Sequence, residues 1–274
     1  MNPKYIIPDK APMGSSVKGA IKEVFASQKK TGEKSGNKRT KMQPFDVKNP
    51  NIISHDYVQI PQLKKIISAF ELKNYNNLNW KNTHFRLHEN GLYMPIIPEF
   101  MTHFQNVIQS YKSKGKTPLF DASGNPFTKD EVKDMYSHLT KDSIAVYEGA
   151  EGTWAWLDAY FEKKDDEFYI LTEHRTQTDS SGNKKLVSNK TEKLEQCLIE
   201  NCFVDFKSLN SQGLPITKDL NQKYIQGENI KFWSPTNDRV AWFFAYSDWA
   251  LLDCGRNPDD TVSNLGVFAV ADAT

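Results

Sequence analysis

The sequence has few cysteines and no long apolar run. Three cysteines among 274 residues are too few, and odd in number, for a disulfide framework. No stretch approaches the roughly 18 consecutive apolar residues that a membrane-spanning helix needs. The opening residues, MNPKYIIPDKAPMGSS, contain no apolar core of a signal peptide. We therefore expect no membrane span and no secretory leader, and a protein that is either cytoplasmic or associated with a virion.

Sequence signatures of common enzymes are also missing. The chain has no glycine-rich phosphate loop, no GxSxG nucleophile turn and no HExxH zinc motif. His84 and His88 are four residues apart, and Glu99 and His103 repeat that spacing, which on a helix would suit zinc ligands. A metal-dependent enzyme using His84, His88 and His103 therefore stays open as an alternative. Two prolines interrupt the segment, so we interpret these histidines as structural and expect neither enzyme activity nor a cofactor.

Charge is distributed unevenly. Residues 1–50 contain eleven Lys/Arg and four Asp/Glu, so they carry +7, and the remainder carries −6 of the net +1. The pattern predicts a short amphipathic helix over Ser16–Ser27 and a basic linker over Gln28–Lys41. We interpret residues 1–60 as a solvated basic extension and residues 61–274 as a folded domain. A weak contact of the extension with nucleic acid or another anionic surface is the alternative, although interleaved aromatic residues for base stacking are lacking.

Helical patterns precede a series of strand patterns, which predicts an α+β fold with mainly antiparallel strands. Apolar spacing predicts helices over Pro61–Leu72 and Pro98–Lys114, and a capping box at Thr128–Glu131 predicts another. Cys197 and Cys202 are assigned to a short helical stretch as packing residues. Strands are predicted around two turns and near the C-terminal end, at Thr153–Phe161, Phe168–Leu171, Ile230–Trp233, Val240–Tyr246 and Leu265–Ala271, with the turns at Lys164–Glu167 and Asp179–Asn183.

The most informative pattern begins at Trp233 and reads WSPTNDRVAWFFAYSDWALLDCGRNPDDTVSNLGVFAVADAT. Small or apolar residues alternate there with a chemically mixed set, and the side chains of a strand alternate between its two faces. One face would pack in the core, while the other would display aromatic, acidic and aliphatic groups together, a mixture that stability does not require. The set assigned to the core is Val240, Ala241, Phe243, Ala245, Ser247, Ala250, Leu252, Cys254, Leu265, Gly266 and Val267.

This segment resembles the variable region of diversity-generating retroelement target proteins. The likeness lies in the frame VAWFxAxSDxAxLxC, here Val240–Cys254, followed by Pro258 and the closing SNLGVFAV. Upstream segments extend it over roughly residues 80–274, among them HFRLHENGLYMPIIPEFMTHFQNV from His84 and TWAWLDAYF from Thr153. The resemblance implies a C-type lectin-like fold, whose last strand the closing SNLGVFAV resembles, with a variable region at about residues 233–270. It also assigns Trp242 to the scaffold.

The residues at the open positions of the frame fit this family's chemistry. A reverse transcriptase that misincorporates at adenines of an AAC or AAT codon cannot produce Lys, Glu, Gln or Met, and none of these stands between Phe244 and Val262. Trp249 requires another template codon, such as AGG.

The resemblance implies a non-enzymatic protein that binds a macromolecular ligand, expected to be a protein, through rigidly displayed residues. Aromatic and Arg side chains would anchor that ligand because they bring large area at low entropic cost. Although many lectins use calcium, the sequence shows no suitable carboxylate set, so none is expected. The predicted contact residues are Asn237, Asp238, Phe244, Tyr246, Asp248, Trp249, Leu251, Asp253, Gly255, Arg256, Asn257, Asp259, Asp260 and Val262.

Overall fold

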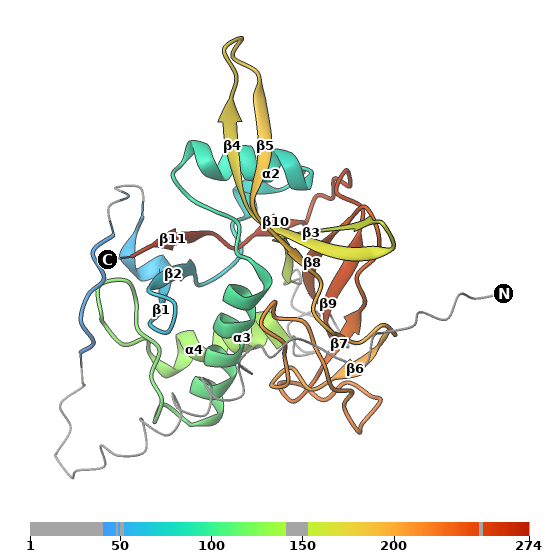
Figure 1. Cartoon of the computed structure of the whole chain (residues 1–274). Helices are drawn as coiled ribbons and strands as arrows, with labels where there is room; N and C mark the ends of the chain where they lie inside the picture. The colour runs from blue at the N-terminus through green and yellow to red at the C-terminus, as the bar shows by residue number, and fades with distance from the viewer. Residues whose placement is uncertain (1–40, 48, 50–51, 141–152, 247–248, 274) are drawn as a thin grey trace. The chain divides into compact units, whose positions relative to one another are not determined.

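A computed structural model describes residues 41–47, 49, 52–140, 153–246 and 249–273 (Figure 1). The chain divides into residues 1–38 and 39–274, and every described residue belongs to the second unit. The helix predicted over Ser16–Ser27, most of the predicted basic linker, and the residues Ser247 and Asp248 lie outside the described residues. Among the helices that are described, none is both long and apolar enough to cross a membrane.

The described residues form an α+β fold that is mostly sheet, as predicted. The helices are α2 (Trp80–Glu89), α3 (Ile97–Lys112) and α4 (Lys129–Thr140), with short 3-10 turns η2 (Ser54–Asp56) and η3 (Lys73–Tyr75). The strands are β1 (Tyr57–Ile60), β2 (Lys65–Ser68), β3 (Thr153–Lys164), β4 (Glu167–Thr178), β5 (Lys184–Lys193), β6 (Cys202–Val204), β7 (Ile230–Trp233), β8 (Arg239–Tyr246), β9 (Trp249–Arg256), β10 (Gly266–Val267) and β11 (Val270–Asp272).

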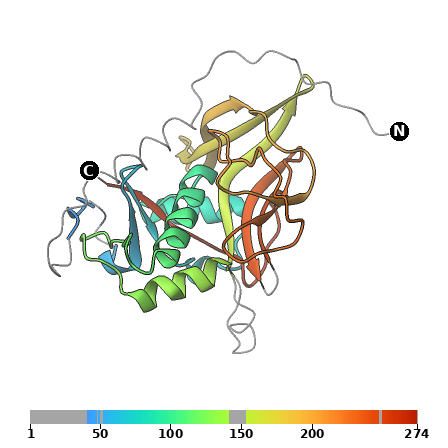
Figure 2. The same cartoon turned by 90° about the horizontal axis from the view of Figure 1, so that it is seen from below.

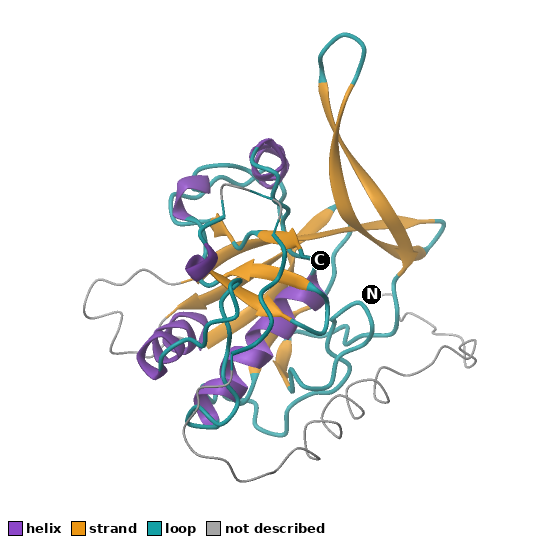
Figure 3. Cartoon of the chain, turned by 90° about the vertical axis from the view of Figure 1, so that its left-hand side faces the viewer, coloured by secondary structure: helices purple, strands orange, loops and turns teal. Residues whose placement is uncertain are grey.

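A large sheet positions the C-terminal segment. Its strand order is β5-β4-β3-β8-β9-β7-β6, with β10 pairing in parallel with the start of β3, while β1, β2 and β11 form a smaller sheet. The pairs along the large sheet are antiparallel except that β7 runs parallel to β9. The β4–β5 hairpin projects beyond the other described elements (Figures 1 and 3).

Helices α3 and α4 cover one face of the large sheet (Figure 2). The main core lies between these helices and the sheet, where Phe100 and Phe104 of α3 pack against Phe243 of β8. Helix α3 lies within two residues of the predicted bounds Pro98–Lys114, and α4 begins at the predicted capping box. Proline stands in the first turn of α3, and the capping box of α4 is formed, since the Thr128 backbone N–H donates to Glu131 Oε2 at 2.7 Å.

The other face carries a second cluster, in which Trp156 and Trp242 pack with Val267.

The turn between β3 and β4 forms where the sequence predicts it, and Asp165 and Asp166 have positive φ there. The strands are longer than a series of short strands would require, since β3 and β4 each span 12 residues.

The helix predicted over Pro61–Leu72 is wrong. The segment contains the turn and the second strand of the β1–β2 hairpin. Lys64 has φ 52° in the turn, and Ile66 pairs with Gln59. Ile66 and Ile67 are adjacent and both fully buried, because the strand is covered on both faces. Two-sided burial imitates helical spacing when it is read from the sequence alone.

The helical stretch assigned to Cys197 and Cys202 is also wrong. Residues 194–201 are irregular, and Cys202 begins β6. Both thiols are free and pack against the main core, which confirms their assignment as packing residues.

Candidate functional site

The two faces of the β8–β9 pair differ in the way that the alternation predicts. On the inner face, Phe243, Ala245, Ala250, Leu252 and Cys254 have no exposed surface. The remaining described members of the set assigned to the core are buried too, namely Val240, Ala241, Leu265, Gly266 and Val267. This part of the prediction is confirmed.

The outer face carries side chains that stand side by side across four strands. We call this surface the aromatic face and define it as Trp154, Lys231, Trp233, Phe244, Tyr246 and Trp249. Its members follow from strand register, since Trp154 pairs with Phe244 and Tyr246 pairs with Trp249. Tyr246 is 42% exposed and Trp233 is 38% exposed, while Trp154, Phe244 and Trp249 are half-buried. Large aromatic groups are therefore presented to solvent on the side of the sheet opposite the main core.

Ring contacts hold the aromatic face together. The rings of Trp154 and Phe244 meet edge to face at 4.6 Å between centroids, and Phe244 lies 6.0 Å from Tyr246. The Lys231 ammonium stands 4.1 Å from the centre of the Trp249 ring and 5.9 Å from that of Trp233. A cation between two indoles fixes their orientation and adds positive charge to an otherwise neutral surface.

The expectation that Leu251 and Asp253 face solvent is wrong. Both lie on the outer side of β9 but are only 4% and 3% exposed. Leu251 is covered because its strand neighbours are Phe244 and Lys231, two long side chains. Asp253 braces the sheet, since its carboxylate accepts from Trp242 Nε1 at 2.6 Å and from the Gly255 backbone N–H at 2.7 Å. Burial raises the pKa of this carboxyl.

Trp242 belongs to the scaffold, as predicted. It is buried, its indole N–H is satisfied by Asp253, and the guanidinium of Arg256 stands 4.5 Å from its ring centre. Arg256 is therefore committed to the ring beneath it and to an ion pair with Asp260 at 2.8 Å.

The other predicted contact residues lie at the opposite end of the β8–β9 pair from Tyr246. Because the strands are antiparallel, the start of β8 lies beside the end of β9. Asn237 Oδ1 accepts from the Lys163 backbone N–H at 2.6 Å, and Asp238 accepts from the Tyr160 hydroxyl at 3.2 Å. Of the predicted set, Phe244, Tyr246 and Trp249 belong to the aromatic face. A separate group, which we call the polar end, is formed by Asn237, Asp238, Gly255, Arg256, Asn257, Asp259, Asp260 and Val262.

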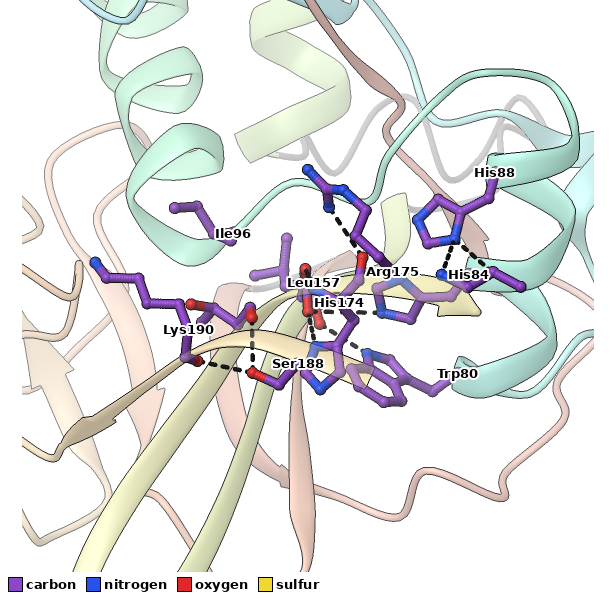
Figure 4. A network of polar contacts seen from close by, with 12 residues as sticks. Trp80, His84, His88, Ile96, Leu157, His174, Arg175, Ser188 and Lys190 are labelled. Atoms are coloured by element: carbon purple, nitrogen blue, oxygen red, sulfur yellow. Dashed lines mark hydrogen bonds and ion pairs between the residues drawn. The ribbon is translucent and has the colours of Figure 1, made fainter. Parts of the chain in front are cut away.

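A buried polar cluster lies elsewhere, where α2 meets β3 and β4. It consists of His84, Asp158 and His174, each of which offers one ligand atom within 4.8 Å of the others (Figure 4). His174 Nδ1 lies 2.5 Å from Asp158 Oδ1, and His84 Nε2 lies 3.6 Å from the same oxygen. The second carboxylate oxygen accepts from the His174 backbone N–H at 3.0 Å.

Burial governs the protonation of this cluster. It lowers the pKa of His84 to about 3, so the imidazole is neutral at pH 7. Burial alone would raise the pKa of Asp158, but the imidazole and the backbone N–H of His174 hold it below its ordinary value. The cluster therefore holds a buried carboxylate beside at least one neutral ring.

The set His84, His88 and His103 does not form as the metal-enzyme alternative requires. His88 follows His84 on α2, with ring centroids 5.8 Å apart, and its Nδ1 lies 2.6 Å from Thr176 Oγ1. His103 stands on α3 against the ring of Phe268, and the metal-suited group found among the described residues does not include it.

Comparisons of the chain with protein-family models, with curated proteins and with solved structures find no match.

The predicted contact residues do not include Trp154, Lys231 and Trp233 of the aromatic face, nor Asp158 and His174 of the polar cluster. The face is assembled by strand register, which pairs Trp154 with Phe244 although the two are 90 residues apart (244 − 154), and alternation within one segment cannot reveal this. One signal was available for the cluster: Asp158 interrupts the apolar run TWAWLDAYF, and a carboxylate inside a buried strand needs a partner.

Proposed function

We propose that this protein binds a macromolecular ligand, without catalysis, through the aromatic face. The observation that carries the proposal is the exposure of Tyr246 and Trp233 beside the half-buried Phe244 and Trp249, on strands whose inner face is fully packed. Exposed aromatic clusters on a soluble domain mark interaction surfaces. The resemblance to retroelement-diversified proteins with a C-type lectin-like fold supports the same conclusion and belongs to the proposal.

The proposed ligand is a protein. Trp and Tyr dominate binding hot spots because their large rigid rings lose little entropy on contact. Lys231 beneath Trp249 adds one positive charge, which favours a carboxylate at the rim of the partner's surface. The polar end, with Asp238 and Asp259 exposed, would contact a ligand only if that ligand also spans the length of β8.

Rigid presentation is the proposed mechanism. The anchors stand on strands whose inner residues fix the backbone, so exchanging an exposed residue alters the surface and leaves the core intact. Such surface exchanges change stability by about 0.5 kcal/mol or less, whereas a binding anchor contributes about 2 kcal/mol or more. Leu251 and Asp253 are excluded from the anchors because they are buried.

The DNA around the gene tests the class of protein. We expect a near-copy of the codons for residues 233–270, beside a gene for a reverse transcriptase, with differences only where the copy has adenine. The differences should fall at the codons of Phe244, Tyr246 and Trp249 and should spare those of Phe243 and Leu252. If no such copy exists, or if its differences fall at the packed positions, the proposal of retroelement diversification is wrong.

A further inference from the structure

Three polar side chains from distant parts of the sequence meet in the interior between α2 and the β3–β4 pair. His84 is fully buried, Asp158 is 1% exposed and His174 is 6% exposed. Figure 4 shows His84 of α2 pointing toward the two strands, where it lies near His174 of β4, with Trp80 beside both. The Trp80 ring stands edge-on to both imidazoles, at 4.5 Å from His84 and 4.9 Å from His174. Both rings are therefore held in place by packing.

The polar groups of this cluster are not fully satisfied. Neither ring nitrogen of His84 has a hydrogen-bond partner among the described residues, and the same holds for Nε2 of His88 one helical turn further on. A buried polar atom without a partner costs roughly 1–3 kcal/mol. Asp158 is buried beside them, and a carboxyl group in the interior needs partners for its oxygens.

We propose that His84, Asp158 and His174 bind a zinc ion, which joins α2 to the β3–β4 pair. Two imidazoles and one carboxylate form a set that zinc accepts, with the fourth position left for a further ligand. The ion gives a nitrogen of His84 the partner that it lacks and coordinates an oxygen of Asp158. This inference does not depend on the proposed ligand-binding function.

The three ligand atoms lie within 4.8 Å of one another, and the two spacings to Asp158 are close to those of a zinc site. Tetrahedral coordination with bonds of about 2.0–2.1 Å places neighbouring ligand atoms about 3.3 Å apart. His84 Nε2 and Asp158 Oδ1 already lie 3.6 Å apart. His174 Nδ1 and Asp158 Oδ1 stand at hydrogen-bond distance, 2.5 Å, so the zinc replaces that bond and separates the two atoms by less than about 1 Å.

The buried position indicates a structural ion. A hollow of about 460 Å³ lies on the outer side of α2, and it is lined by Asn74, Asn76, Leu78, Asn82, Phe85, Arg86, Glu89 and Lys184. None of the three proposed ligands lines this hollow. Trp80 closes the cluster on another side, and its indole N–H donates to Leu157 O at 2.9 Å. The described residues thus give a substrate no approach to the ion, which would act on stability.

Metal analysis of the untagged full-length chain tests the proposal. After equilibration with zinc and removal of free ion, we expect about one zinc per chain, and cobalt in its place should give the visible bands of a tetrahedral ion. His84→Leu and His174→Leu should each lower the affinity by more than about 100-fold. His103→Leu is the matched control, because it also removes a fully buried histidine but one outside the cluster, and it should retain the zinc.

Several outcomes would overturn the site. Wild-type chain that binds neither zinc nor cobalt would show that a proton shared between His174 and Asp158 satisfies the cluster. Zinc retained by His84→Leu would place the ion elsewhere. If the leucine variants do not fold, the wild-type chain decides alone, since the proposal requires a higher unfolding temperature in zinc than in chelator.

Discussion

At the scale of single residues, the outer face of β8 and β9 has exposed positions and buried positions that look alike in the sequence. Tyr246 is exposed and stands at the end of a strand, whereas Asp253 is buried and satisfies two N–H groups. Both occupy open positions of the variable-region frame. Exposure therefore separates residues whose substitution changes mainly the surface from residues whose hydrogen bonds stabilise the sheet.

We predict that Tyr246→Ala and Asp253→Ala differ sharply in their effect on stability. Tyr246→Ala should change the free energy of unfolding by about 0.5 kcal/mol or less, because it removes an exposed ring. Asp253→Ala should cost about 2–4 kcal/mol, since it leaves the Trp242 indole N–H and the Gly255 N–H without their acceptor in the interior. Urea denaturation of both variants measures this, and equal losses would contradict the division.

His103 provides a second prediction at this scale. It has no exposed surface, and neither ring nitrogen has a hydrogen-bond partner among the described residues. Burial lowers the pKa of His103 from 6.5 to about 3. The native state therefore binds fewer protons than the unfolded chain between these values, so this residue removes stability as pH falls from 6.5 towards 3.

The substitution His103→Leu should raise the free energy of unfolding and make it less dependent on pH. At pH 7 we expect a gain of about 1 kcal/mol, because an apolar side chain of similar volume replaces an unsatisfied polar one. Below pH 6 the gain should grow by up to about 1.4 kcal/mol per pH unit, the value for one proton. Denaturation midpoints at pH 7 and pH 5 measure both effects. A gain that does not increase at pH 5 would show that His103 is protonated in the native state.

At the scale of elements, the sequence predicts those whose signals are local. Helices α3 and α4 have proline or a capping box at their start and one apolar stripe each, and the β3–β4 turn has two aspartates that tolerate positive φ. Several elements were not predicted, and two of them show how tertiary contacts decide the structure. The β1–β2 hairpin is buried on both faces, and α2 is a mostly polar helix that becomes stable by packing Trp80, His84 and Leu87.

Helix α2 also limits what could be predicted of the polar cluster. The HFRLH spacing places two histidines on one face if the segment is helical, as it is in α2, but the partners of His84 come from β3 and β4. No periodicity within residues 80–110 contains that information. The same argument explains why His103, with suitable spacing from Glu99, was grouped with His84 although its ring lies against Phe268.

We predict that α2 depends on Asn79 as its N-cap. The Asn79 side chain accepts from the Asn82 backbone N–H at 2.9 Å, and this is the bond that an N-cap residue contributes to the first turn. Asn79→Ala should lower the free energy of unfolding by about 1 kcal/mol. Asn82→Ala, an exposed change in the same turn that keeps the cap, should have little effect, and hydrogen exchange of the α2 amides would locate the loss. Similar exchange rates in both variants would contradict the role of the cap.

At the scale of the whole molecule, charge is segregated along the chain. The net charge of +1 conceals +7 in residues 1–50 and −6 in the remainder. The aromatic face lies in the acidic part and contributes only Lys231 to its own surface. A nucleic acid or another polyanion would thus be attracted to the basic extension and not to the aromatic face, so the two contacts can be tested separately.

The alternative interpretation of the basic extension, a contact with nucleic acid, predicts that the chain binds duplex DNA weakly at low salt and loses this binding as salt rises. In a plot of the logarithm of the binding constant against the logarithm of the salt concentration, each phosphate contact contributes about −0.9 to the slope. Replacing Lys29, Lys30, Lys34, Lys38 and Arg39 by Gln should abolish the binding while the unfolding temperature stays unchanged. The matched control is Tyr246→Ala with Trp249→Ala, which should leave DNA binding intact because these residues belong to the aromatic face. Fluorescence anisotropy over a salt series measures the affinity, and binding that survives the glutamine substitutions would assign the polyanion contact to the folded part of the chain.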